Sequence, residues 1–212
     1  RLAVAAGLAP ETSLWVYDLG GRPPLPLAEG GINRSPLWSP DGSRVFFTSN
    51  LGGGTWDIYA VSSDGSSPRP QVVPTFGRTG LAAMTAFLPR TPLTWLRDGR
   101  LVFSMIKPTG TDMDLFAVPP EGSDSPDEIL RSGDTESSGT VSPDGRWLAY
   151  RSTRTGRGEI WVMGVDGAAP VRVSQNGGDE PEWSRDGHEL YFLEGNRMMA
   201  VAVSPGPEFV FR

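Results

Sequence analysis

Cysteine is absent from the 212 residues, so the chain can form neither a disulfide nor a thiolate metal site. This absence is compatible with the bacterial periplasm or the outside of a cell. Long apolar runs are missing too, because none approaches the roughly 18 residues that a membrane-spanning helix needs. The sequence therefore predicts no membrane span within this chain, although a longer parent protein could be membrane-anchored.

Positive charge is also scarce. The chain has 19 Lys and Arg against 25 Asp and Glu, a formal charge of −6, and a single histidine. An acidic chain without a basic stripe cannot neutralise a phosphate backbone, so we expect no nucleic-acid partner. His188 directly follows an Asp-Gly turn, where we expect it in solvent, and no G-x-S-x-G motif is present. We therefore expect no Ser-His-Asp catalytic triad.

Glycine and proline, by contrast, are plentiful, with 27 Gly and 20 Pro spread along the chain. They accompany a repeated phrase that ends in Asp-Gly, found at Trp38–Gly42, Trp95–Gly99, Val141–Gly145 and Trp183–Gly187. Asp-Gly adopts positive φ readily and is a strong hairpin signal. We interpret each of these aspartates as capping its own turn rather than as part of a binding site.

Two short apolar strands are expected after each phrase. The first reads RVFFTS at 44–49 and RWLAY at 146–150, runs that are typical of buried strands. In three units the second strand opens with an acidic residue: Asp57, Asp114 and Glu159. We expect Tyr59, Phe116 and Trp161, which lie on these second strands, to be buried between neighbouring units.

The Asp-Gly marks recur at intervals of 57, 46 and 42 residues, which is the period of a propeller blade. The predicted fold is therefore all-β, a β-propeller of four-stranded antiparallel blades in a single domain over 1–212, with about five blades present. The expected repeats cover approximately 1–30, 31–74, 75–131, 132–174 and 175–212. Because the chain begins at the second strand of its first unit, we expect this blade to lack its innermost strand and the chain to be a piece of a larger propeller. Residues 80–87 are the one helical candidate.

The phrase W-S-P-D-G, followed by a short strand, a loop and (D/E)-I-(Y/W)-x-V-x-x-D-G, resembles the TolB-type, WD-like propeller repeat of bacteria. Residues 38–65 match it almost in full, and residues 141–167 match with Val141 in place of Trp. The ending, 191–211, is similar to propellers that serve receptor-type serine/threonine kinases and related regulators. The resemblance implies a module that binds proteins or ligands in the periplasm or outside the cell, and it implies no single activity.

Candidate site residues lie on the loops that lead into the innermost strands, because these loops line the mouth of the central channel. They carry Asn33, Arg34, Glu136, Asp179 and Glu180. Oxygen donors from several repeats could hold a calcium ion or form the carboxylate pair of a glycoside-cleaving site. A solvated acidic rim is the alternative interpretation. No residue is assigned as a metal ligand, and calcium is the one cofactor considered.

The same face carries three candidate partner-binding residues, Trp56 at the end of a glycine-rich loop and Arg154 and Arg157 in a basic loop. Our hypothesis is a non-catalytic propeller that acts as a protein-interaction or ligand-sensing module. The alternative is a carbohydrate-active enzyme or a cation-dependent lyase that works through acidic residues at the channel mouth.

Overall fold

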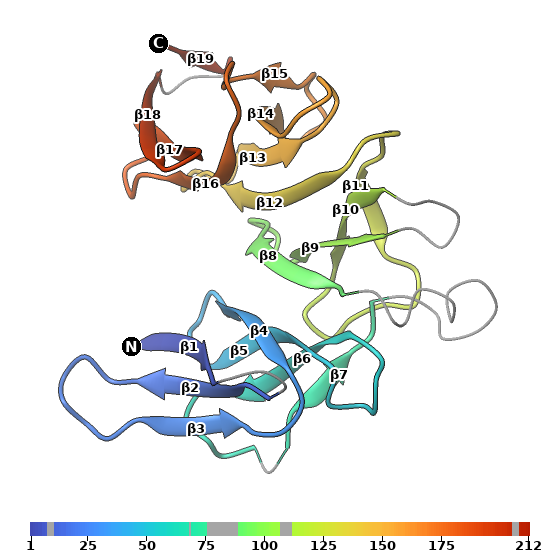
Figure 1. Ribbon diagram of the computed structural model, residues 1–212, viewed down its shortest axis with the longest axis vertical. Helices are drawn as coiled ribbons and strands as arrows, with labels where there is room; N and C mark the ends of the chain where they lie inside the picture. Colours follow the sequence, from blue (N-terminus) through green and yellow to red (C-terminus); the bar gives the residue numbers. More distant parts are fainter. Residues whose placement is uncertain (8–10, 68, 76–88, 107–111, 205–207) are drawn as a thin grey trace.

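The computed structural model describes residues 1–7, 11–67, 69–75, 89–106, 112–204 and 208–212. Within these residues the chain forms strands and turns, with no helix, so none could span a membrane. The helical candidate at 80–87 lies outside the described residues and stays a prediction. Five antiparallel sheets follow one another along the chain, and Figure 1 shows them set along an arc with both termini on the same side.

The first sheet has three strands and each of the other four has four, paired in sequence order. The first sheet is thus one strand short, as predicted. The first two sheets comprise β1 (Leu2–Ala6), β2 (Ser13–Tyr17) and β3 (Leu25–Ala28), then β4 (Asn33–Trp38), β5 (Arg44–Ser49), β6 (Asp57–Ser62) and β7 (Gln71–Val73).

The remaining three sheets repeat the four-stranded pattern. They comprise β8 (Thr91–Trp95), β9 (Leu101–Ile106), β10 (Met113–Val118) and β11 (Asp127–Leu130), then β12 (Glu136–Val141), β13 (Trp147–Ser152), β14 (Glu159–Gly164) and β15 (Val171–Arg172), then β16 (Asp179–Trp183), β17 (Glu189–Glu194), β18 (Arg197–Ser204) and β19 (Val210–Phe211). The innermost strands β4, β8, β12 and β16 lie next to one another along the arc (Figure 1).

Alternate residues of a strand pack against different neighbouring sheets. Phe46 of β5 joins Phe103 and Phe116 in the core between the second and third sheets, whereas Val45 and Phe47 join the core between the first and second sheets. Because both faces of the strand are covered, its sequence is a continuous apolar run and does not alternate. Such packing explains why the sheets are stacked, since a lone sheet would leave both faces in water.

The second strand after each phrase is the third strand of its sheet. Of the three aromatic residues on these strands that we expected to be buried, two are. Tyr59 is 5% exposed and Phe116 is 4% exposed, as predicted. Trp161 is only half-buried, which corrects the expectation for that residue. It packs at the margin of the core between the third and fourth sheets, and the guanidinium of Arg154 lies 4.5 Å from its ring centre on the outside.

The Asp-Gly phrases form tight turns that their own aspartates cap. Asp41 accepts hydrogen bonds from the backbone N–H of Ser43 at 3.0 Å and from the hydroxyl of Ser39 at 2.6 Å, while Gly42 has a φ of 69°. Asp144 and Asp186 make the equivalent contacts in their repeats. This geometry confirms the structural interpretation of these carboxylates. His188 is exposed beside one of these turns, as expected.

Tryptophans of the repeated phrase connect neighbouring innermost strands. The indole N–H of Trp95 on β8 donates to the carbonyl of Trp38 on β4 at 2.7 Å, and that of Trp183 on β16 donates to Thr140 on β12 at 3.2 Å. Where the fourth sheet has Val141 and no indole, the backbone N–H of Val141 itself donates to Thr94 at 3.3 Å. The phrase therefore links sheets as well as forming turns.

Candidate functional site

An open cavity of about 460 Å³ lies where the four innermost strands meet. Its polar lining comes from every one of these strands and includes Ser35, Thr91, Ser138, Thr140, Glu180 and Glu182. We call it the inner-strand cavity. Hydroxyl and carboxylate groups share the lining with Pro92, Leu93 and Pro181, so the cavity can accept hydrogen bonds from a ligand that brings cationic or hydroxylated groups.

Each innermost strand begins with a break in its pairing register. In three of them the residue at the break has a left-handed backbone, with φ of 50° at Ser35, 50° at Ser138 and 49° at Glu180. Non-glycine residues rarely adopt this conformation, which costs on the order of 1–2 kcal/mol. Such a break in register is a β-bulge, which changes the direction of the strand where it borders the cavity. The left-handed residue recurs at matching positions of three repeats.

Glu180 is an exposed carboxylate at the break in β16. It contributes to two cavities, the inner-strand cavity and a neighbouring one of about 280 Å³ that Arg151 and Asp179 also line. Arg151 and Asp179 form an ion pair at 3.6 Å. Burial raises the pKa of Glu182, on the other side of the strand break, above its usual value.

Arg34 and Trp56, which the sequence assigned to different roles, lie together. The guanidinium of Arg34 at the start of β4 is 5.2 Å from the ring centre of Trp56, in the loop before β6. Arg34 is exposed and Trp56 is half-buried. A cation over an indole face is worth about 0.5–1 kcal/mol at an exposed site, and it leaves the outer edges of both groups available to a partner.

Asn33 and Glu136 open their strands as predicted, but both side chains are 0% exposed. The amide of Asn33 donates to the carbonyls of Thr12 and Gly30, and Glu136 accepts hydrogen bonds from two serine hydroxyls. This placement corrects the expectation that these two side chains face the channel mouth. The first residues of β4 and β12 are thus buried, whereas Ser35 and Ser138, two residues further along, line the cavity.

Arg154 and Arg157 are both engaged within the chain. Arg154 covers Trp161 and donates to the phenol of Tyr150 at 3.4 Å. Arg157 donates to Glu159 at 2.7 Å and also to the carbonyl of Gln175. The side chain of Arg157 is still 56% exposed, so only part of its donor capacity is directed inward.

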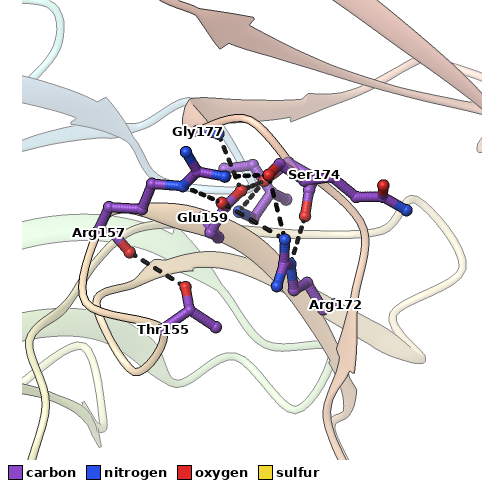
Figure 2. Close-up of polar contacts among 8 residues, drawn as sticks. Thr155, Arg157, Glu159, Arg172, Ser174 and Gly177 are labelled. Carbon is purple, nitrogen blue, oxygen red and sulfur yellow. Dashed lines mark hydrogen bonds and ion pairs between the residues drawn. The ribbon is translucent and has the colours of Figure 1, made fainter.

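Figure 2 shows Glu159 at the centre of a polar cluster between the fourth and fifth sheets. Burial alone would raise the pKa of this fully buried carboxylate, but hydrogen bonds from Ser174, Arg157 and the backbone of Gly177 together hold it below its usual value. Arg172 adds an ion pair at 3.7 Å. The hydrogen bonds and the arginines offset the cost of burying the carboxylate, which stays ionised at neutral pH. We therefore interpret the cluster as a structural contact between the two sheets.

One buried ion pair escaped the sequence reasoning. Arg90, just before β8, is 4% exposed and lies 3.0 Å from Asp57, the acidic residue that opens β6 in the preceding sheet. The sequence did contain a signal, because counting back five residues from the first residue of each phrase aligns Arg90 with Asn33 and Glu136. The insertion that lengthens the third repeat obscured this alignment.

No group of three or more His, Cys, Asp or Glu side chains within the described ranges is arranged to hold a metal ion. The calcium hypothesis therefore has no assembled carboxylate site among those residues and remains untested.

Five radially set antiparallel sheets with adjoining innermost strands define a protein of the β-propeller class. Known structures of the same fold are TolB-type propellers. A protein described as a TolB candidate from Agrobacterium tumefaciens superimposes with a TM-score of 0.69 at 22% identity, covering 94% of this chain and 73% of that one. TolB from Acinetobacter baumannii gives a TM-score of 0.72 at 18% identity, covering 99% of this chain and 52% of that one.

Sequence comparison is less informative than the fold. No protein-family model matches the chain. An uncharacterised protein of Agrobacterium fabrum is 30% identical over 190 residues, which are 86% of this chain and 59% of that protein. The chain thus spans 59% of the length of this curated relative.

Enzymes share the fold as well. An oligogalacturonate lyase in complex with manganese gives a TM-score of 0.64 at 16% identity, covering 92% of this chain and 55% of that one. A gluconolactonase from Xanthomonas campestris gives 0.62 at 17% identity, covering 91% and 68%. Likeness at these identities concerns the fold and leaves the activity of this chain open.

Proposed function

We propose that the chain is a non-catalytic propeller module that binds a protein partner or a small polar ligand at the inner-strand cavity. The observation that carries this proposal is the convergence of all four innermost strands on one open cavity, with the exposed Glu180 in its lining. The resemblance to TolB-type propellers supports a location in the periplasm or outside the cell. Attachment to a receptor kinase remains a prediction without support among the relatives named above.

The chemistry of the cavity favours a ligand that brings hydrogen-bond donors or positive charge. Its lining combines carboxylates with hydroxyls, and the chain as a whole carries a charge of −6. A basic segment of a partner protein would be attracted to such a surface, at a rate that falls as ionic strength rises. Nucleic acid would be repelled.

Thermal unfolding with a panel of probes tests the proposal. A short arginine-rich peptide, a neutral oligosaccharide and an oligogalacturonate are added in turn to the chain and to two variants. We expect one probe to raise Tm by mass action. Glu180→Gln should abolish that rise, whereas Arg185→Ala, an exposed change at an Asp-Gly turn away from the cavity, should retain it. An equal response in both variants, or no response to any probe, would contradict binding at this cavity.

An enzymatic role is the second candidate, favoured by the lyase and gluconolactonase that share the fold. Asp179, Glu180 and Glu182 are the carboxylates near the cavity that could take part in it. Incubating the chain with pectic and other polysaccharides and with sugar lactones, each with and without Mn²⁺ or Ca²⁺, tests this role. New reducing ends, unsaturated products or lactone opening that Glu180→Gln removes would establish it. A rise in Tm at millimolar Ca²⁺ would separately support the calcium site.

A further inference from the structure

Two arginines converge on one buried acid at the junction between the fourth and fifth sheets (Figure 2). Arg157, in the loop before β14, lies 2.7 Å from the carboxylate of Glu159, and Arg172 of β15 lies 3.7 Å from the same carboxylate. The side chain of Glu159 is 0% exposed. One ionised carboxylate balances one guanidinium, so the three side chains together keep a net positive charge.

These arginines are far more exposed than the arginine at the second junction. The side chain of Arg90 is 5% exposed where it meets Asp57, so it is enclosed between the sheets. The side chains of Arg157 and Arg172 are 56% and 34% exposed. This pair therefore has an inner side, which holds Glu159, and an outer side that a dissolved group can reach.

The inner contacts leave hydrogen-bond donors over on both guanidinium groups, each of which carries five N–H groups. Nε and Nη2 of Arg157 donate to Glu159 and to the carbonyl of Gln175. Nε and Nη2 of Arg172 donate to the carbonyls of Ser174 at 2.7 Å and Gln175 at 3.2 Å. Among the residues that the structure describes, neither Nη1 has a hydrogen-bond partner. Both N–H groups of each Nη1 are therefore available to a ligand.

An open cavity of about 300 Å³ lies against these arginines, and we call it the two-arginine cavity. It is lined by Thr155, Gly156, Arg157, Glu159 and Arg172, so its one carboxylate is the one that the arginines already hold. Thr155 is exposed, and its hydroxyl makes a long contact of 3.5 Å with the carbonyl of Arg157. That hydroxyl can donate to a ligand instead, because so long a contact is weak.

We propose that the two-arginine cavity binds an oxyanionic group, a phosphate or a carboxylate, through Nη1 of Arg157, Nη1 of Arg172 and the hydroxyl of Thr155. Guanidinium groups suit the oxygens of phosphates and carboxylates, and the resulting hydrogen bonds are charge-assisted. The inner contacts hold both guanidinium groups in place before a ligand arrives, so less side-chain freedom is lost on binding.

This site is distinct from the inner-strand cavity. The two cavities share no lining residue, and their chemistry is opposite, since the inner-strand cavity suits cationic groups. The anion site therefore does not rest on the function proposed for the inner-strand cavity, and either one can fail without the other.

NMR spectroscopy of the arginine Nε–H groups tests the proposal on the wild-type chain. Inorganic phosphate replaces chloride at constant ionic strength in one titration, and succinate does so in a second, so that general screening stays the same. We expect saturable shifts of the Arg157 and Arg172 signals with at least one of the two anions. A response to phosphate alone or to succinate alone identifies the oxyanion that the cavity takes, whereas no saturable shift with either would overturn the proposal.

Variants then separate a built site from general attraction to positive charge. Arg157→Lys keeps the charge and a donor for Glu159 but loses the planar fork, and Thr155→Val removes a donor that does not contact Glu159. Each should weaken binding of the responding anion by about tenfold or more, as for loss of a hydrogen bond to a charged group.

Arg185→Lys is the matched control, because it makes the same change at an exposed arginine of an Asp-Gly turn, and it should bind the anion as the wild type does. Should Arg157→Lys fail to fold, Thr155→Val and the wild-type titrations still decide the question. Unchanged affinity in both Thr155→Val and Arg157→Lys, or an equal loss in Arg185→Lys, would overturn the site.

Discussion

The ion pair between Arg90 and Asp57 should contribute far more to stability than a surface pair of similar geometry. Its side chains are 5% and 12% exposed and lie 3.0 Å apart. Arg100 and Asp127 lie 2.7 Å apart but are 34% and 69% exposed. The distances are nearly the same, so burial decides the difference. At 3.0 Å the attraction is about 5.5 kcal/mol for an effective dielectric constant of 20 and about 1.4 kcal/mol for 80.

Double-mutant cycles turn this contrast into a measurement. We combine Arg90→Met with Asp57→Asn, and Arg100→Met with Asp127→Asn, and measure free energies of unfolding in urea at pH 7. Arg90→Met alone should cost about 3–5 kcal/mol, because it leaves a buried carboxylate without its cation. The coupling energy of the buried pair should be about 2–3 kcal/mol, and that of the surface pair about 0.2–1 kcal/mol. Coupling below 1 kcal/mol for the buried pair would refute the reasoning.

Three further outcomes are expected. Trp95→Phe removes the indole N–H that links two innermost strands and should cost about 1 kcal/mol in urea unfolding, and an unchanged midpoint would show that the bond adds nothing. Gly122→Ala should destabilise more than Gly167→Ala, because both glycines have positive φ but an added Cβ lies 2.3 Å from a backbone carbonyl only at Gly122. Hydrogen bonds, chiefly from Ser39, lower the pKa of Asp41 to about 2, so Asp41→Asn should lessen the loss of stability as pH falls from 4 to 2, and an acid profile identical to wild type would argue against it.

The architecture could be predicted from the sequence because short local patterns specify it and recur in every repeat. Asp-Gly turns specify where the strands reverse, and apolar runs such as RVFFTS specify strands that are covered on both faces. The same repeats also predicted that the first sheet would have one strand fewer. Trp161 was misjudged because the phrase fixes which strand a residue occupies but does not fix how completely the neighbouring side chains cover it.

The site was harder to predict because it depends on which way individual side chains point. The sequence placed Asn33, Arg34 and Glu136 together at the channel mouth, since all three begin innermost strands. In a strand, however, successive side chains point to opposite faces, and a register break then changes that alternation. Asn33 and Glu136 consequently point between sheets, and only Arg34 is exposed. Neither the strand breaks nor the left-handed residues at them have a signal in a single sequence, because Ser and Glu rarely adopt that conformation.

The position five residues before each repeated phrase shows how one backbone supports several chemistries. Asn33, Arg90, Glu136 and Gly178 occupy it in successive sheets, and each meets different surroundings between the sheets. Asparagine bonds to backbone carbonyls of the first sheet, and arginine neutralises an acid. Glycine makes room, because a Cβ there would lie 2.6 Å from Ile160. Glutamate accepts hydrogen bonds from two serine hydroxyls. Because the four sheets share the same strand pairing, the different chemistry of each junction must reside in its side chains.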